Sequence, residues 1–262
     1  MSWNNVSLEK RLIVVLMMLS SDAMVFGAKI LFIPSNVNSH VLHLSRLAAD
    51  LTQLGHVTCV LAPSNARVPH FVAEAESGGN FTYTKYPVNG KEPFFNSRYV
   101  SEVITRLALS QSLWEKLSGT SDLMKEIVND HESDCVRLLE NVQLMQQIRD
   151  GGFQFAVMEP AAPHCYYAIP YSMKIRYASV ARPSFIWTYR VPQLAPFVSR
   201  LFGLGYTDRM TLVQRLTTFI FDNLDMLKSQ NETTTYITEL APDRPVLSSQ
   251  QLLEQVWYCQ TV

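Results

Sequence analysis

The sequence predicts an α/β fold built on a doubly wound parallel sheet. Short apolar runs, typical of strands that are buried on both faces, recur along the chain. Stretches with apolar residues at helical spacing separate these runs, and turn residues close each segment. A strand, a helix and a further strand in this order form a parallel unit, and its crossover is almost always right-handed.

The first such unit opens the sheet. Residues 29–34, Lys-Ile-Leu-Phe-Ile-Pro, form an apolar run that a proline ends. A turn follows, and then apolar residues from Val41 to Leu54 recur at helical spacing until Gly55, which predicts a helix. The run Val-Thr-Cys-Val-Leu-Ala-Pro at 57–63 predicts the second buried strand.

The remaining segments continue the alternation of strands and helices. Further strands are predicted at residues 81–86, 153–158 and 177–181. We find no internal repeat, no low-complexity tract and no glycine-rich phosphate loop. The predicted helices cover about residues 99–117, 121–148, 161–174 and 211–227.

Composition narrows the classes of function. The formal net charge is −1 and no cluster of Lys and Arg occurs, so we expect no nucleic acid partner. Four cysteines are too few and too scattered for a disulfide scaffold or a zinc pattern, and we expect neither a metal site nor a bound cofactor. Cys59 in a predicted strand and Cys165 in a predicted helix are expected to be buried thiols; the other two are Cys135 and Cys259.

The N-terminus resembles a targeting segment. Two basic residues precede a short apolar run at 12–19, and small residues follow. This pattern predicts a secretory signal peptide over about residues 1–27, cleaved after Ala23 or Gly27. A buried helix and an uncleaved anchor are the alternatives. Beyond this segment, no stretch reaches the roughly 20 apolar residues of a membrane helix.

Three tripeptides match the N-glycosylation pattern, which requires an exposed acceptor. Those at Asn80 and Asn231 agree with a secretory route, whereas the one at Asn5 would leave with the signal peptide. Each match gives weak support, because such tripeptides arise often by chance.

Two side chains suited to acid–base chemistry fall at the edge where an open parallel sheet binds ligands, beyond the carboxyl ends of its strands. His40 stands at the mouth of the first helix, and Glu159 follows the strand at 153–158. A carboxylate beside an imidazole orients the ring and raises its basicity, which gives a general base near neutral pH. On spacing alone, a histidine at a helix start is more often a helix cap or a surface residue, and a glutamate in this position also suits the start of the next helix.

Several segments of the chain carry short motifs in a fixed order. The opening combines a strand, Asn-Ser-His, a helix, a Gly-His pair and a second strand. A later strand ends in an acidic residue before a Pro-x-Cys helix start, and an Asp-x-Met-Thr-Leu-x-x-Arg helix follows. In this order and spacing the segments resemble UDP-glycosyltransferases, especially animal UDP-glucuronosyltransferases, from about residue 29 to the C-terminus. The matching segments are residues 38–40, 44–51, 54–61, 153–159, 163–165 and 207–216.

This resemblance implies a two-domain inverting glycosyltransferase with Rossmann-like halves and an active site between them. Residues 28–262 would be the N-terminal domain, which binds a lipophilic acceptor such as a phenol or steroid. His40 matches the catalytic base, which is typically worth about 10²–10⁴ in rate. Glu159 matches its acidic partner, which is usually Asp, so the carboxylate here has one extra methylene. The resemblance also implies a reaction that needs no metal ion. It further implies a location in the lumen of the endoplasmic reticulum.

The acceptor pocket should come from the variable stretches of the chain. A pocket for a phenol or steroid is largely apolar, although most buried aromatic residues belong to a core. The candidates are Phe94, Phe95, Tyr99, the helix that bears Leu107 and Trp114, and residues 185–197.

The motifs that hold the sugar donor in the family do not occur in this sequence. Neither His-Gly-Gly nor Asp-Gln is present, and there is no anchor helix. We therefore expect a protein whose complete relatives use UDP-glucuronic acid or UDP-glucose as co-substrate, and which does not transfer sugar without a donor half.

Two other interpretations stand beside the acceptor half of a glycosyltransferase. A non-catalytic relative would bind lipophiles, or pair with full-length family members or with itself through exposed apolar surface. An unrelated α/β hydrolase would require a Gly-x-Ser-x-Gly pentapeptide, which the sequence lacks.

Overall fold

The computed structural model describes residues 27–159, 164–181, 211–216, 240–245, 247 and 257–260. Six strands form one sheet in the order β3-β2-β1-β4-β5-β6, and every neighbouring pair is parallel. The strand order reverses between β1 and β4, as it does in doubly wound folds. The predicted Rossmann-like α/β architecture is confirmed. The strands are β1 (Lys29–Ile33), β2 (Val57–Pro63), β3 (Phe81–Tyr86), β4 (Phe155–Met158), β5 (Arg176–Ala181) and β6 (Trp257–Gln260).

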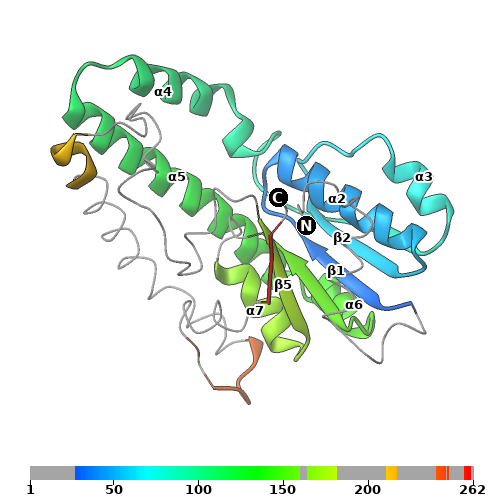
Figure 1. Cartoon of the computed structure of the whole chain (residues 1–262). Helices are drawn as coiled ribbons and strands as arrows, with labels where there is room; N and C mark the ends of the chain where they lie inside the picture. The colour runs from blue at the N-terminus through cyan, green and yellow to red at the C-terminus, as the bar shows by residue number, and fades with distance from the viewer. Residues whose placement is uncertain are drawn as a thin grey trace, which may run out of the picture.

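Helices cover both faces of the sheet (Figure 1). On one face, α2 (Asn38–Gln53) and α3 (Val72–Ser77) pack on alternate residues of β1 and β2, among them Phe32 and Val60. On the other face, residues such as Leu31 pack against three helices. Since successive residues of β1 enter two different cores, its uninterrupted apolar run is explained. The three helices are α5 (Leu113–Glu140), α6 (Val142–Asp150) and α7 (His164–Ser172).

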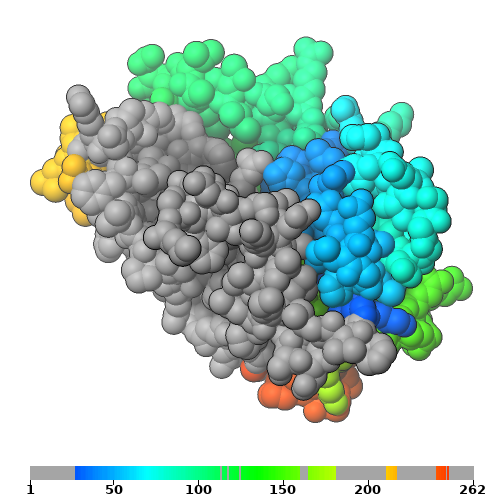
Figure 2. Space-filling view, turned by 45° about the vertical axis from the view of Figure 1, so that its right-hand side comes forward, coloured from blue at the N-terminus to red at the C-terminus, as the bar shows by residue number. Residues whose placement is uncertain are grey.

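The α4–α5 pair extends from the sheet as an antiparallel hairpin (Figure 1). The helix α4 (Arg98–Leu109) follows a short 3-10 turn, η2 (Phe94–Asn96), and packs on α5 through its own small core. In the space-filling view, α2 and α3 form one side of the visible surface and the green hairpin lies along its top (Figure 2). The hairpin core contains Val100, Val103, Leu107, Leu123 and Ile127.

Two helix boundaries differ from the prediction of helices at 99–117 and 121–148. The Ser112 side chain accepts a hydrogen bond from the Glu115 backbone N–H, which starts α5 earlier. The Asn141 side chain accepts one from the Leu144 N–H, which starts a separate helix, α6. Both residues are N-caps, and they start new helices where the helical spacing of apolar residues continues without a break.

Further segments differ in smaller ways. The sequence analysis did not predict α3, η2 or β6. Gly55 adopts a φ of 91°, a conformation that favours glycine, and it follows the end of α2 as predicted. Of the predicted helix at 211–227, residues 211–216 are described, and residues 212–216 are helical. The predicted signal segment lies outside the described residues.

The prediction of a buried thiol at Cys165 is wrong. Cys165 forms a disulfide with Cys135, which joins α7 to α5 across a Cα–Cα distance of 6.3 Å. The two cysteines are 30 positions apart, and no sequence spacing reveals that α5 packs on α7. Cys59 is a free, half-buried thiol, and its burial raises the pKa of the thiol.

Two observations concern the predicted secretory route. Asn80 is exposed in the turn before β3, whereas Asn5 and Asn231 lie outside the described residues. In the described part of the chain, no helix combines the length and apolar character needed to span a membrane.

Candidate active site

The candidate site lies at the carboxyl edge of the sheet, where the strand order reverses. Ile33 and Met158, the last residues of β1 and β4, are register partners. Ser35 and His40 follow β1, and Glu159 follows β4 directly. The strand pairing therefore brings together side chains that are more than a hundred positions apart in the sequence.

His40 and Glu159 are in direct contact there, as the sequence analysis expected of neighbours. Nδ1 of His40 lies 2.6 Å from Oε2 of Glu159. The His40 side chain is 25% exposed and that of Glu159 is 10% exposed, so the imidazole can be reached while the carboxylate is enclosed. The N-cap of α2 is Val37 and not His40, and α7 is described from His164 onward.

Ser35 joins the pair as a third member. Its Oγ lies 2.7 Å from Nδ1 of His40 and donates a hydrogen bond of 3.2 Å to Oε2 of Glu159. Ser35 is fully buried, so this hydroxyl is enclosed with the carboxylate. The sequence analysis placed Ser35 only in a turn. Its position directly after the proline that ends the first strand was the one available signal.

The contacts define the chemistry of His40. An ionised carboxylate only accepts hydrogen bonds, so Nδ1 of His40 carries the hydrogen in the neutral ring. The lone pair of that ring then lies on Nε2, as a general base requires. A carboxylate in this position can stabilise the positive charge of an imidazole that takes a proton at Nε2.

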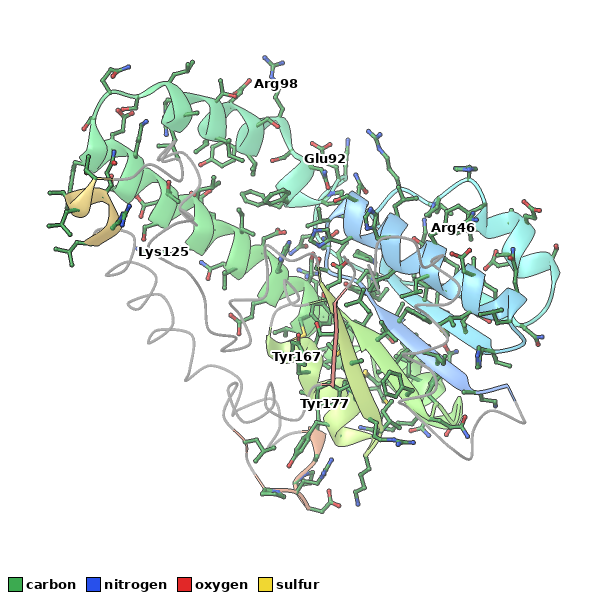
Figure 3. All side chains as sticks on the ribbon, in the orientation of Figure 1. Arg46, Glu92, Arg98, Lys125, Tyr167 and Tyr177 are labelled. Atoms are coloured by element: carbon green, nitrogen blue, oxygen red, sulfur yellow. A yellow bond between two sulfur atoms is a disulfide. The ribbon has the colours of Figure 1, made fainter. Side chains whose placement is uncertain are left out.

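The backbone around the pair is held on both sides. The carbonyl of Val37 accepts a hydrogen bond from the His40 N–H, which fixes the first turn of α2. The Tyr167 hydroxyl donates to the backbone carbonyl of Glu159 at 3.2 Å. Tyr167 in turn packs edge-on against Tyr177, with ring centroids 5.9 Å apart, and the two lie near each other in Figure 3.

A second polar group, Asp134 on α5, contacts the loop between β1 and α2. Asp134 accepts hydrogen bonds from the Asn36 side-chain amide and, at 3.3 Å, from the Asn89 backbone N–H. Burial raises the pKa of Asp134 to about 6. Burial, with repulsion from His40, lowers the pKa of His131 to about 4. The sequence analysis identified none of these residues as part of a site.

The predicted acceptor-pocket residues fall in different environments. Phe94 and Phe95 are partly buried against the α4–α5 core, and Leu107 belongs to that core. Tyr99 and Trp114 are 49% and 77% exposed. Residues 185–197 lie outside the described residues. Of the six candidates, the structure therefore assigns only Leu107 fully to the protein interior.

A cavity of about 280 Å³ lies elsewhere. It is lined by Lys29 and Val57, the first residues of β1 and β2, and by Gly151 and Phe153, which precede β4. Its other lining residues lie along β2 and β3 and on α6, so the cavity lies between α6 and the sheet and contains neither His40 nor Glu159. Among the described residues, no group of three or more His, Cys, Asp or Glu side chains is placed to hold a metal ion.

Comparison with known proteins agrees with the resemblance in the sequence. Residues 28–250 match the model of the UDP-glucoronosyl and UDP-glucosyl transferase family. This chain belongs to that family. The match covers most of the sheet and both members of the His40–Glu159 pair.

Individual relatives are distant. UDP-glucuronosyltransferase 2A3 of Mus musculus is 23% identical over 214 residues, which cover 76% of this chain and 37% of the relative. UDP-glucuronosyltransferase 1A5 of Rattus norvegicus is 25% identical over 201 residues, which cover 74% and 36%. The solved apo structure of Phytolacca americana UGT2 has a TM-score of 0.42 and 13% identity, with 78% of this chain and 44% of that chain covered. This family member thus spans little more than a third of the length of the two relatives.

Proposed function

We propose that this chain binds a small lipophilic acceptor for the transfer of a hexosyl group from a UDP-sugar, with His40 as the general base. The observation that carries the proposal is the 2.6 Å contact between Nδ1 of His40 and Oε2 of Glu159 at the carboxyl edge of the sheet. Family membership supplies the reaction class, and the pair supplies the group that starts the reaction.

The proposed step is a single displacement. Nε2 of His40 takes the proton of the acceptor hydroxyl as its oxygen attacks the anomeric carbon of the sugar. The bond between that carbon and the UDP oxygen breaks, and UDP leaves with the bonding electrons, so the anomeric configuration inverts. Glu159 stabilises the imidazolium until the proton is released to solvent.

The glutamate in place of the more usual aspartate is compatible with this role. Oε2 of Glu159 already reaches hydrogen-bonding distance of His40, and Ser35 contacts the same oxygen. The glutamate side chain thus reaches the imidazole, and the Tyr167 hydroxyl donates a hydrogen bond to the backbone carbonyl of the same residue.

The two substrates would bind to different parts of the complete enzyme, the acceptor to this chain and the sugar donor to a separate half. We propose that residues 28–262 form the acceptor domain, and that UDP-glucuronic acid or UDP-glucose binds to a half supplied by further sequence or by another chain. The absence of His-Gly-Gly and Asp-Gln from the sequence supports this division. We also place the protein in the lumen of the endoplasmic reticulum, supported by the signal-like N-terminus and by the exposed sequon asparagine, Asn80.

The first test measures phenol binding and UDP release. The purified chain should be thermally stabilised by a simple phenol and should release no UDP from either UDP-sugar. A donor-binding half from a relative, added in trans or fused, should restore release. His40→Ala should then abolish release and leave phenol binding unchanged, whereas His43→Ala, on the exposed side of α2, should retain both.

Each outcome tests a separate part of the proposed function. Release by the chain alone would contradict the divided arrangement, and release by His40→Ala would contradict the assigned base. Failure of every phenol and steroid to stabilise the chain would contradict acceptor binding.

A second candidate function is a non-catalytic partner that binds lipophiles or pairs with relatives. It is favoured by Leu109 and Trp114, which are 74% and 77% exposed near the junction of α4 and α5. Under this function, His40→Ala would alter neither ligand binding nor pairing, and no donor half would restore UDP release.

A further inference from the structure

The strand β3 lies at one end of the described sheet. It pairs with β2, and no further strand lies beside it in the part of the chain that the structure describes. The carbonyls of Asn80 and Tyr86 accept hydrogen bonds from backbone N–H groups of Thr58 and Ser64, at the two ends of β2. Backbone groups alternate in direction along a strand, so those of residues 81, 83 and 85 point away from β2.

An edge of this kind can pair with a strand of another chain. The sequence of β3 is Phe-Thr-Tyr-Thr-Lys-Tyr, whose aromatic and β-branched residues favour a strand and which carries one charge. Outward N–H and C=O groups on such a strand are a template for aggregation, and folded proteins protect them. One of these groups is already occupied here, because the Tyr83 N–H donates to Oε1 of Glu76 at 3.1 Å.

The residue before this strand is the acceptor of an N-glycosylation pattern. Asn80, Phe81 and Thr82 form the tripeptide Asn-x-Thr. Asn80 and Thr82 are exposed, whereas Phe81 is 3% exposed and belongs to the core beneath α2 and α3. Both side chains that define the pattern are therefore accessible, and the residue between them fixes the backbone to the fold.

The turn that carries Asn80 lies on the surface. The helix α3 ends at Ser77, and the four residues from Ser77 to Asn80 are all exposed. Gly79 has a φ of 76°, a conformation that favours glycine, and its N–H donates to the Glu76 carbonyl at 3.0 Å. The backbone of the turn thus presents Asn80 to solvent beside the outward edge of β3.

This position is remote from the candidate active site along the strands. All neighbouring strands are parallel, so the residue before β3 lies at the amino edge of the sheet. His40 and Glu159 follow β1 and β4 at the carboxyl edge. A group attached to Asn80 therefore leaves the His40–Glu159 pair open.

We propose that Asn80 carries an N-linked oligosaccharide, which covers the outward edge of β3. The inference rests on the proposed location in the lumen of the endoplasmic reticulum, with a lipid-linked oligosaccharide diphosphate as donor. Nδ2 of Asn80 loses a proton and forms a bond to the anomeric carbon of the first sugar. The bond between that carbon and the diphosphate oxygen breaks, and the lipid diphosphate leaves with the bonding electrons. Thr82 supplies the hydroxyl that the acceptor pattern requires.

The first measurement locates the oligosaccharide. The full chain is expressed in animal cells behind an added cleavable signal peptide and is treated with a peptide N-glycosidase, which converts a modified asparagine into aspartate. The mass of the peptide that contains position 80 should show this conversion in the wild type and in Thr82→Ser, which keeps the pattern. Thr82→Ala, which removes the pattern at the same exposed position, should show none.

The second measurement tests the protection of the strand edge. Thr82→Ser and Thr82→Ala change the same exposed residue but differ in the oligosaccharide, so they form a matched pair. In sedimentation velocity at rising protein concentration, Thr82→Ala should form larger species where Thr82→Ser still matches the wild type. Asn80→Gln, which removes the acceptor and keeps the hydroxyl, should behave as Thr82→Ala does.

The outcomes separate the oligosaccharide from the proposed function. An unmodified Asn80 in a chain whose added signal peptide has been cleaved would overturn the proposal. Equal association of Thr82→Ser and Thr82→Ala would overturn the protection of the edge. Modification behind the added signal peptide, but not behind the chain's own N-terminus, would retain the site and refute the proposed location. Failure of the phenol and UDP-release tests would refute the proposed function alone, because Asn80→Gln should change neither result.

Discussion

Oε2 of Glu159 contacts Nδ1 of His40 at 2.6 Å and accepts a hydrogen bond from Ser35 Oγ at 3.2 Å. One carboxylate oxygen therefore serves two donors, and Ser35 also contacts the imidazole at 2.7 Å. The arrangement fixes the ring by two neighbours rather than one. Ser35, His40 and Glu159 thus each contact the other two. Substitutions of Glu159 can test the charge and the length of its side chain separately.

Glu159→Gln should reduce sugar transfer by about 10²–10⁴-fold in the chain supplied with a donor-binding half. The amide loses the negative charge, and its N–H₂ group can favour the wrong tautomer of His40. Glu159→Asp keeps the charge but shortens the reach, so it should fall between the wild type and the amide. Steady-state UDP release measures all three, and equal rates for Glu159→Gln and wild type would contradict the role of Glu159.

Ser35→Ala should slow transfer less severely, by about 10- to 100-fold. Hydrogen bonds to charged groups are worth about 1.5–3 kcal/mol, and the variant leaves the His40–Glu159 contact in place. Ser39→Ala removes an exposed hydroxyl from the same helix start and should have no effect. A loss as large as that of His40→Ala would mean that Ser35 does more than orient the pair.

Asp134→Asn should gain stability relative to wild type as the pH rises. Burial raises the pKa of Asp134 from 3.8 to about 6, so the folded chain binds this proton more tightly than the unfolded chain. Ionisation therefore destabilises the folded state, an effect absent below about pH 3.8 and complete above about pH 6. The variant lacks the effect, and its relative free energy of unfolding should rise on the order of 2–3 kcal/mol between pH 4 and pH 7. Urea unfolding at several pH values provides the measurement.

His131→Gln should show the opposite trend in the same range. Burial, with repulsion from His40, lowers the pKa of His131 from 6.5 to about 4, so protonation destabilises the folded state. That effect is complete below about pH 4 and absent above about pH 6.5, and the glutamine variant lacks it. Relative to wild type, its free energy of unfolding should fall on the order of 2–3 kcal/mol between pH 4 and pH 7. Trends of the same sign in the Asp134 and His131 variants would contradict these environments.

The strands and the His40–Glu159 pair were predictable because both depend on local patterns and one general rule. A strand buried on both faces needs an uninterrupted apolar run, and parallel strands bring their carboxyl ends to one edge. His40 and Glu159 follow such runs, so the rule alone places them at the same edge of the sheet. Residues 110–112 and 141 were harder to interpret, because the side chains of Ser112 and Asn141 cap the starts of new helices there while the apolar spacing continues.

The polar residues around the pair depend on tertiary packing, which no local pattern records. Asn36 and Asp134 are 98 positions apart, and they meet because α5 crosses the carboxyl edge of the sheet. Ser35 lies in a turn of ordinary composition, and only the position of Glu159 gives its hydroxyl a role. The disulfide was missed for the same reason, since its partners lie in two helices that the sequence does not pair.

Replacing both cysteines of the disulfide by alanine should lower the free energy of unfolding by about 3–4 kcal/mol. The bond closes a loop over a sequence separation of 30, and a cross-link of this length stabilises chiefly by restricting the unfolded chain. Because both sulfurs are buried, the double variant Cys135→Ala/Cys165→Ala is a cleaner comparison than reduction. Denaturant unfolding measures the difference, and Cys59→Ala, which removes the free thiol, is the control. A midpoint equal to that of the wild type, or a non-reducing digest without a linked Cys135–Cys165 peptide pair, would contradict the disulfide.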